Sequence, residues 1–192
     1  MLKYLVISVL AIGVMSVAVR VSTNALFTDS QAVGSNTFTT GSLDLSAQKT
    51  SDSLTLSSMA PGDAVVAPID VTNTGSLALR YAVVSTTTED ALAGELQLTV
   101  KSGVNHCDSE HFTNEGEGTT LYSGELGSTS GVDVIGDPVQ GPQTGDRTLA
   151  AGSDETLCFQ VALPLSATNT YQGKSTTANF DFVAEQTANN NT

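Results

Sequence analysis

Short stretches in which apolar and polar residues alternate recur along the whole chain, and this pattern constrains the fold most. A period of two residues is typical of β-strands with one face on a core and the other in solvent. The apolar members of these runs are Leu43 and Leu45; Leu54 and Leu56; Leu77, Leu79, Tyr81 and Val83; Leu96, Leu98 and Val100; Leu157, Phe159, Val161 and Leu163; Phe180 and Phe182. Only residues 90–94 have the composition of a single helical turn.

Residues that favour turns separate the alternating runs. The sequences are APGD at 60–63, TNTG at 72–75 and YQGK at 171–174. The predicted turn residues are Pro61, Gly62, Asp63, Gly75 and Gly173, because Pro presets one backbone angle and Gly tolerates positive φ. Strands spaced by roughly 8 to 12 residues predict one antiparallel sandwich or barrel over residues 41–187, followed by a polar tail at 188–192.

The first 25 residues have the order of a secretory signal peptide. Lys3 precedes an apolar run at 4–19, and Thr23 and Ala25 occupy the small-residue positions before a cleavage site. We therefore expect cleavage between Ala25 and Leu26 and a secreted product. A retained membrane anchor is the alternative, but a spanning helix needs about 20 apolar residues.

The predicted mature chain is strongly acidic. It keeps five of the 7 Lys and Arg residues, because Lys3 and Arg20 leave with the signal, against 20 Asp and Glu residues, a formal charge of −15. Such a surface repels phosphate backbones and anionic lipid. We expect no nucleic-acid partner and no stable membrane insertion after cleavage.

Two cysteines, Cys107 and Cys158, remain in the chain that is predicted to be exported. An even count outside the cytosol predicts one disulfide; free thiols or metal ligands are the alternative. Between about 105 and 150 the alternation weakens into Gly, Ser and acidic residues, and only 119–126 and 132–135 resemble strands. We interpret this interval as an acidic insertion with the disulfide at its base.

Residues that could carry out chemistry are few. His106, Asp108, Glu110 and His111 lie close in sequence, yet the two histidines are five apart rather than the four of the HExxH zinc motif. No GxSxG, P-loop or GxGxxG motif occurs. We therefore predict no catalytic residue, no metal site and no cofactor, with weak calcium binding by surface carboxylates such as Glu115 as the remaining option.

Three segments together resemble the TasA/camelysin family of secreted biofilm-matrix and cell-surface proteins. They are NTFTTGSLDLSAQ at 36–48, the stretch from LSSMAPGD to TNTGSLALRYAV at 56–84, and NTYQGKSTTANFDFVAEQ at 169–186. The leader and the ALFTD that follows it are also similar to this family, whose precursors are processed by a SipW-type signal peptidase. The interval 101–156 shows little resemblance.

The resemblance implies a jelly-roll sandwich whose copies polymerise head to tail by donor-strand complementation. Here the donor strand and linker would be residues 26–40. The implied donor residues are Leu26, Phe27, Asp29, Gln31, Val33 and Thr37. The implied function is a structural subunit of a fibre in an extracellular matrix or at the cell surface, with the same protein as partner and an accessory or initiating subunit as a further one.

Two other functions stay open at this point. One is a monomeric surface adhesin or binding module that uses the 105–146 interval as its contact surface. The other is a metallopeptidase, because camelysin members have been classed as such. The absence of HExxH favours a chain that is not an enzyme.

Overall fold

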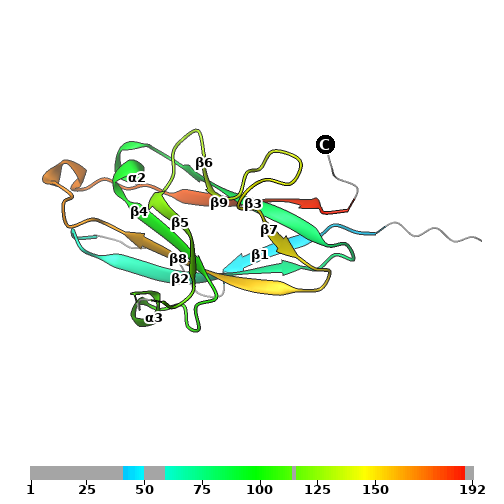
Figure 1. Cartoon of the computed structure of the whole chain (residues 1–192). Coiled ribbons are helices and arrows are strands. Elements are labelled where there is room, and N and C mark those ends of the chain that lie inside the picture. The colour runs from blue at the N-terminus through cyan, green and yellow to red at the C-terminus, as the bar shows by residue number, and fades with distance from the viewer. Residues whose placement is uncertain (1–40, 50–58, 114–115, 189–192) are drawn as a thin grey trace, which may run out of the picture. The chain divides into compact units, whose positions relative to one another are not determined.

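Strands pair into two antiparallel sheets in the computed structural model, which describes residues 41–49, 59–113 and 116–188 (Figure 1). The first sheet contains, in spatial order, β1 (Leu45–Lys49), β2 (Ala64–Asn73), β8 (Asp154–Ala162), β4 (Gln97–Ser102) and β5 (Thr119–Glu125). The second sheet is centred on β3 (Leu79–Thr87), which pairs with β9 (Ala178–Gln186), β6 (Val132–Ile135) and β7 (Arg147–Leu149). Short helices are α2 (Ala91–Glu95), α3 (Ser109–Thr113) and the 3-10 turn η1 (Asn169–Tyr171).

The hydrophobic core lies between the two sheets. Alternate residues of β3, β4 and β8 point into it, among them Leu79 and Val83, Leu98 and Val100, and Leu157 and Phe159, all fully buried. These are the apolar positions of the predicted alternating runs. The predicted all-β sandwich is therefore confirmed, and residues 91–95 form the expected helical turn; Leu54 and Leu56 lie outside the described residues.

The two ends of the sandwich differ in which connections they hold. The proximal end contains Gly41, the β2–β3 connection at 74–78 and the end of β9, because Leu45 pairs with Asn73 and Leu79 with Gln186. The distal end contains the beginning of β2 and of β9, because Ala64 pairs with Ala162 and Thr87 with Ala178. The chain thus enters the sandwich at the proximal end.

Asn73 organises the proximal end. Its side chain is fully buried, and its amide nitrogen donates to the backbone oxygens of Leu77 at 2.8 Å, Ala150 at 3.0 Å and Leu149 at 3.2 Å. Its side-chain oxygen accepts a hydrogen bond from Gly75 N at 3.0 Å. One side chain therefore joins the β2–β3 turn to the β7–β8 connection, and satisfies its own polar atoms in doing so.

A polar cluster links the two sheets near the proximal end. The Tyr81 hydroxyl of β3 donates to Glu155 Oε1 of β8 at 2.8 Å, and Arg147 Nη2 of β7 lies 2.5 Å from Glu155 Oε2. Burial, followed by the adjacent Glu155 charge, raises the pKa of Tyr81 far above its ordinary value. The phenol therefore stays protonated and keeps donating across the sheets.

The interval expected to be an acidic insertion contributes to both sheets. It contains β5, β6 and β7, which pair with β4 and β3. Its strand-like pieces at 119–126 and 132–135 are strands, but residues 147–149 also form one. The interval is better described as part of the sandwich with long connections, because the turns rather than the strands carry its acidic, Gly-rich composition.

Candidate functional site

One side of the sandwich, between the edge strands β1 and β9, is hollowed. The hollow has a volume of about 290 Å³. Its lining residues are Ala47, Ile69, Ala178, Asn179, Phe180, Asp181 and Phe182. The aromatic rings at 180 and 182 pack on the core from this side and stay only half-buried. We call this hollow, with the β9 edge beside it, the open side.

The opposite side of the sandwich is closed by the chain itself. Residues 126–131 cross from β5 in the first sheet to β6 in the second. Leu126 is buried there; its N–H donates to Leu96 O at 2.9 Å, and its carbonyl accepts from Ser85 Oγ at 2.6 Å. On this side the chain itself therefore covers the core between the two sheets.

The sheet edges differ in how well they could pair with a new strand. β9 pairs with β3 along all 9 of its residues without a register shift. In contrast, the β4–β5 ladder shifts register between Val100 and Lys101, leaving a bulge in β5, and β6 and β7 have only 4 and 3 residues. Bulges and short strands protect an edge from pairing, so β9 presents the longest regular edge in the described residues.

The predicted turn residues lie at the two ends. Gly62 has φ of 98°, and its turn is held by Asp63, whose side chain accepts from Ala60 N at 2.8 Å. Gly173, with φ of 75°, follows η1. Gly75 sits in the turn fixed by Asn73, where a Cβ would lie 2.5 Å from Ser42 O. The 60–63 and 171–174 turns thus lie at the distal end, and Gly75 lies at the proximal end.

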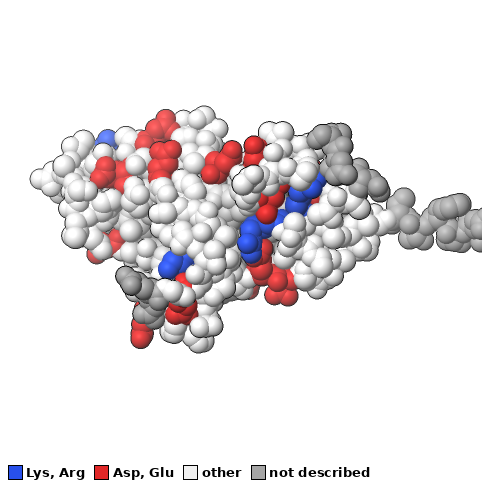
Figure 2. Space-filling view, in the orientation of Figure 1, with Lys and Arg blue, Asp and Glu red and all other residues white. Residues whose placement is uncertain are grey.

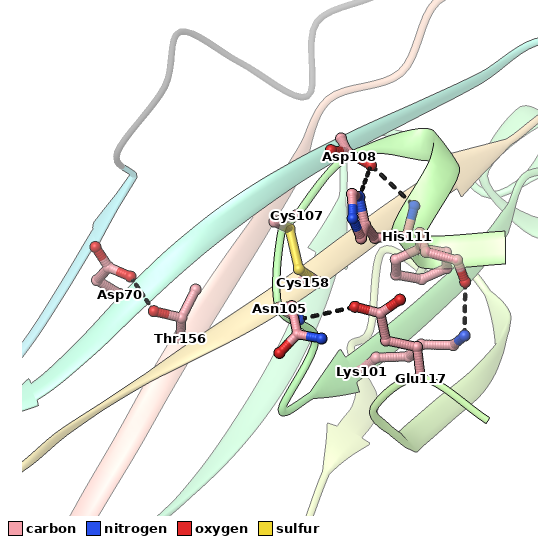
Figure 3. The surroundings of a disulfide bond; sticks show 10 residues. Asp70, Lys101, Asn105, Cys107, Asp108, His111, Glu117, Thr156 and Cys158 are labelled. Atoms are coloured by element: carbon pink, nitrogen blue, oxygen red, sulfur yellow. Dashed lines mark hydrogen bonds and ion pairs between the residues drawn. A yellow bond between two sulfur atoms is a disulfide. The ribbon is translucent and has the colours of Figure 1, made fainter. Parts of the chain in front are cut away.

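The disulfide fastens a loop to the outer face of the first sheet (Figure 3). Leu157 and Phe159 face the core, so Cys158 between them faces outward, yet it is 1% exposed. What covers it is the α3 cap, which we define as residues 103–113 and 116–118. Lys101 holds the cap from β4: its Nζ donates to Phe112 O at 2.6 Å and lies 4.8 Å from the Phe112 ring centre.

The two histidines lie on the exposed surface of the α3 cap. His111 Nδ1 lies 2.8 Å from Asp108 Oδ1, and the same oxygen accepts from His111 N at 2.9 Å. The ring centres of His106 and His111 are 4.8 Å apart. The Asp108 side chain raises the pKa of His111, and hydrogen bonds from His111 lower the pKa of Asp108.

This arrangement does not fit a catalytic metal centre. Among residues 41–49, 59–113 and 116–188, no three His, Cys, Asp or Glu side chains come close enough to hold one ion. Cys107 is joined to Cys158, so the expected disulfide is confirmed and the thiol and metal-ligand alternatives are wrong. The cap is a structural element with a polar surface.

Some predicted residues lie outside the described part of the chain. They are Ala25 and Leu26 at the cleavage site and the donor residues Phe27, Asp29, Gln31, Val33 and Thr37. Sequence reasoning in turn missed the role of Asn73, the Tyr81–Glu155–Arg147 cluster and the Lys101 contact. The open side was also missed, because its lining comes from β1, β2 and β9, far apart in the sequence.

Residues 2–191 match the camelysin metallo-endopeptidase family. The chain belongs to this camelysin family. Membership supports a secreted or cell-surface protein, and in the part of the chain that the structure describes no helix is long and apolar enough to cross a membrane.

Other comparisons add little to the family assignment. A search of curated proteins finds no match. Among solved structures, this camelysin-family chain is similar to Spo0M, a sporulation control protein from Bacillus subtilis, with 16% identity and a TM-score of 0.27. The likeness covers 75% of this chain and 49% of that protein, so it spans about half of Spo0M. At this level of likeness, Spo0M supports no argument about function.

Proposed function

We propose that this camelysin-family chain is a structural subunit of an extracellular or cell-surface fibre, and that copies join by donating a β-strand. The donated segment is residues 26–37 of one copy, which follow the predicted cleavage site, and the acceptor is the open side of the next copy. The observation that carries the proposal is a long regular edge beside a hollow that is lined in part by the half-buried Phe180 and Phe182. Extended segments bind such edges through backbone hydrogen bonds, while pockets take alternate side chains.

The dimensions agree with this mode of assembly. Twelve extended residues span about 40 Å at about 3.3 Å each, more than the roughly 30 Å of a nine-residue strand. The half-buried Phe180 and Phe182 offer an apolar surface on which Leu26, Phe27 or Val33 can pack. A strand in this position would also cover an edge that proteins ordinarily protect.

The polarity of the sandwich predicts a head-to-tail polymer. The donor segment precedes Gly41, so it leaves its own subunit at the proximal end. The hollow lies beside the first half of β9, toward the distal end. A donor that enters the next copy from its distal end therefore places all copies in the same orientation, and each copy both donates and accepts.

Deletion of residues 26–37 from a chain that begins at Leu26 tests the proposal. We expect the full mature chain to form fibres in negative-stain electron microscopy and the deleted chain to remain a soluble, folded monomer. A synthetic peptide of residues 26–40 should bind the deleted chain with one-to-one stoichiometry. Fibres that persist after the deletion would overturn strand donation. A full mature chain that stays a folded monomer would also overturn it, since residues 26–37 would then not occupy the open side of another copy.

A variant that fills the hollow tests the acceptor separately. Ala178→Leu places a larger side chain at the lining, so we expect peptide binding and fibre formation to weaken while the fold persists. Thr148→Leu is the matched control, because it enlarges an exposed residue of β7 away from the open side. Equal assembly of the two variants would exclude this hollow as the acceptor.

The charge of the mature chain makes assembly dependent on salt. Subunits of formal charge −15 repel one another, and salt shortens the range of that repulsion to about 8 Å at 0.15 M. Figure 2 shows acidic side chains distributed over the visible face, with few basic ones. We expect fibres to form faster as sodium chloride or a divalent cation is added, measured by light scattering; equal rates in dilute buffer would contradict this.

We also propose that the chain is not a peptidase, despite the name of its family. The support is the lack of an HExxH sequence and the engagement of His111 by Asp108. The test is casein hydrolysis by the purified chain with added zinc and with a chelator. Cleavage that requires zinc would overturn this part of the proposal.

A further inference from the structure

Exposed apolar side chains occur at both ends of the sandwich. Leu165 is 84% exposed at the distal end, in the turn closed by Ala167 N and Pro164 O at 3.0 Å. It rests against the 60–63 turn, because a Cβ on Gly62 would lie 2.9 Å from its Cδ2. Leu43 is 45% exposed at the proximal end. Hydrogen bonds of Ser42 to Ser76 hold the chain beside the β2–β3 turn there.

The chain stretches that carry these two leucines contain no charged residue, although the chain is strongly acidic; Asp63 lies in the turn beside Leu165. No Asp, Glu, Lys or Arg occurs in the distal stretch 164–173, which contains Leu165. None occurs in the proximal stretches 41–43, 73–79 and 149–153. In Figure 2 the distal tip, at the left, is correspondingly uncoloured. Asp44 and Asp154 border the proximal surface without lying inside it.

We infer that the distal turn with Leu165 docks on the proximal end of a second copy beside Leu43. This inference rests on the proposed function and adds a second contact to it, between folded sandwiches rather than between a strand and a groove. End-to-end packing brings together surfaces with few charged residues, whereas side-by-side packing opposes acidic ones and is repulsive. Because the donor strand and its linker, residues 26–40, end just before Gly41, a copy that donates its strand brings its own Leu43 to the acceptor's distal end.

The contact explains how head-to-tail order is favoured before strands exchange. Apolar surface removed from water at the ends stabilises the correct orientation. It also shortens the distance that the donor must search, because both partners are already aligned. The α3 cap lies over the outer face of the first sheet, and the β6–β7 connection at 136–146 is held to the second sheet by the Gly141 N–H, which donates to Glu185.

A charge introduced at the contact tests the inference. Leu165→Asp should raise the critical concentration for fibres by about tenfold to a hundredfold, the loss expected when one leucine no longer becomes buried. Val139→Asp is the matched control, since it adds the same charge at an exposed apolar residue, 62% accessible, in a side connection. Both side chains are exposed, so both variants should keep the melting temperature of the parent chain.

The outcomes separate the inference from the function on which it rests. If the parent chain forms no fibres, both fail. If it forms fibres and the two variants assemble equally well, the end contact is wrong and strand donation stands. If only Leu165→Asp is impaired in assembly while it still binds the peptide of residues 26–40, the contact is supported.

Cross-linking gives a second readout. A chain with Leu43→Cys and Leu165→Cys should produce a ladder of covalent oligomers with a short bismaleimide, because each copy then joins two neighbours. A mixture of the two single variants should stop at dimers. A pair of Leu43→Cys with Val139→Cys should give no ladder, and a ladder of equal yield from this pair would overturn the inference.

Discussion

The two sheets of the sandwich are covered on their outer faces by different means. The α3 cap lies over the first sheet and is fastened by the Cys107–Cys158 disulfide. The β6–β7 strap, residues 136–146, is fastened to the second sheet by Glu185 of β9, which accepts from Gly141 N at 2.9 Å and pairs with Arg80 of β3. One cover is covalent, and the other is ionic and hydrogen-bonded.

The difference shows how each outer face tolerates an otherwise unfavourable residue. In the first sheet an outward cysteine is 1% exposed, and in the second an outward arginine is 6% exposed. The arginine is stable in that position because its carboxylate partner is itself satisfied by a backbone N–H. The cap should therefore respond to reducing agents, and the strap to loss of charge.

Removal of the disulfide should have the largest effect. Cys107→Ala with Cys158→Ala opens a connection of 51 residues, which the loop-entropy relation values at about 4 kcal/mol. We expect the free energy of unfolding, measured with urea, to fall by that amount. A reductant should destabilise the parent chain similarly and leave the double variant unchanged; a change below about 1 kcal/mol would mean that noncovalent contacts alone hold the cap.

Removal of the Arg80 charge beneath the β6–β7 strap should have the second largest effect on stability. Arg80→Met keeps most of the side-chain volume but removes the guanidinium that pairs with Glu185, so we expect a loss of about 2 to 3 kcal/mol in urea unfolding. The double variant with Glu185→Gln should recover part of this loss. If Arg80→Met alone were neutral, the ion pair would not be what holds the second cover.

Lys101→Met is the equivalent change under the cap and should cost less. Its ammonium bonds one carbonyl and one aromatic face of Phe112, so about 1.5 kcal/mol is expected. The disulfide still fastens the cap in this variant. The free energies of unfolding of Lys101→Met and the parent chain should differ by the same amount with and without a reductant. If the difference disappears upon reduction, the disulfide and the Lys101–Phe112 contact do not act independently.

The fold followed from local patterns, but the contacts between distant residues did not. Alternation predicted β3, β4, β8 and β9 because one face of each strand is apolar. It did not predict β2, where Pro68 interrupts the pattern; Pro68 lies just beyond the Lys49–Ile69 end of the β1 pairing. Asn73 contacts Leu149, 76 residues away, and nothing in the local sequence distinguishes it from the Asn residues of ordinary turns.

The surface of the α3 cap should show the smallest effect, a dependence on pH. The pKa of His111 is raised above 6.5. The stability that its charged imidazole gives to the α3 cap is therefore fully present below pH 6.5 and is lost as pH rises through the raised pKa. The pKa of Asp108 is lowered below 3.8. The stability that its carboxylate gives to the α3 cap is therefore present above pH 3.8 and is lost as pH falls through the lowered pKa. Both contributions coexist between about pH 4 and 6.5.

Amide exchange at Phe112, whose N–H donates to Asp108 O at 2.9 Å, reports on this window. Protection should decrease from pH 6 to pH 8 in the parent chain, after correction for the intrinsic exchange rate. It should not change in His111→Gln, which keeps a polar side chain but does not titrate. Glu110 and Glu117 also favour the charged imidazole, so Glu117→Gln should shift the transition to lower pH. If the protection of the Phe112 amide depends on pH identically in the parent chain and in His111→Gln, the disulfide and Lys101 alone hold the α3 cap in place.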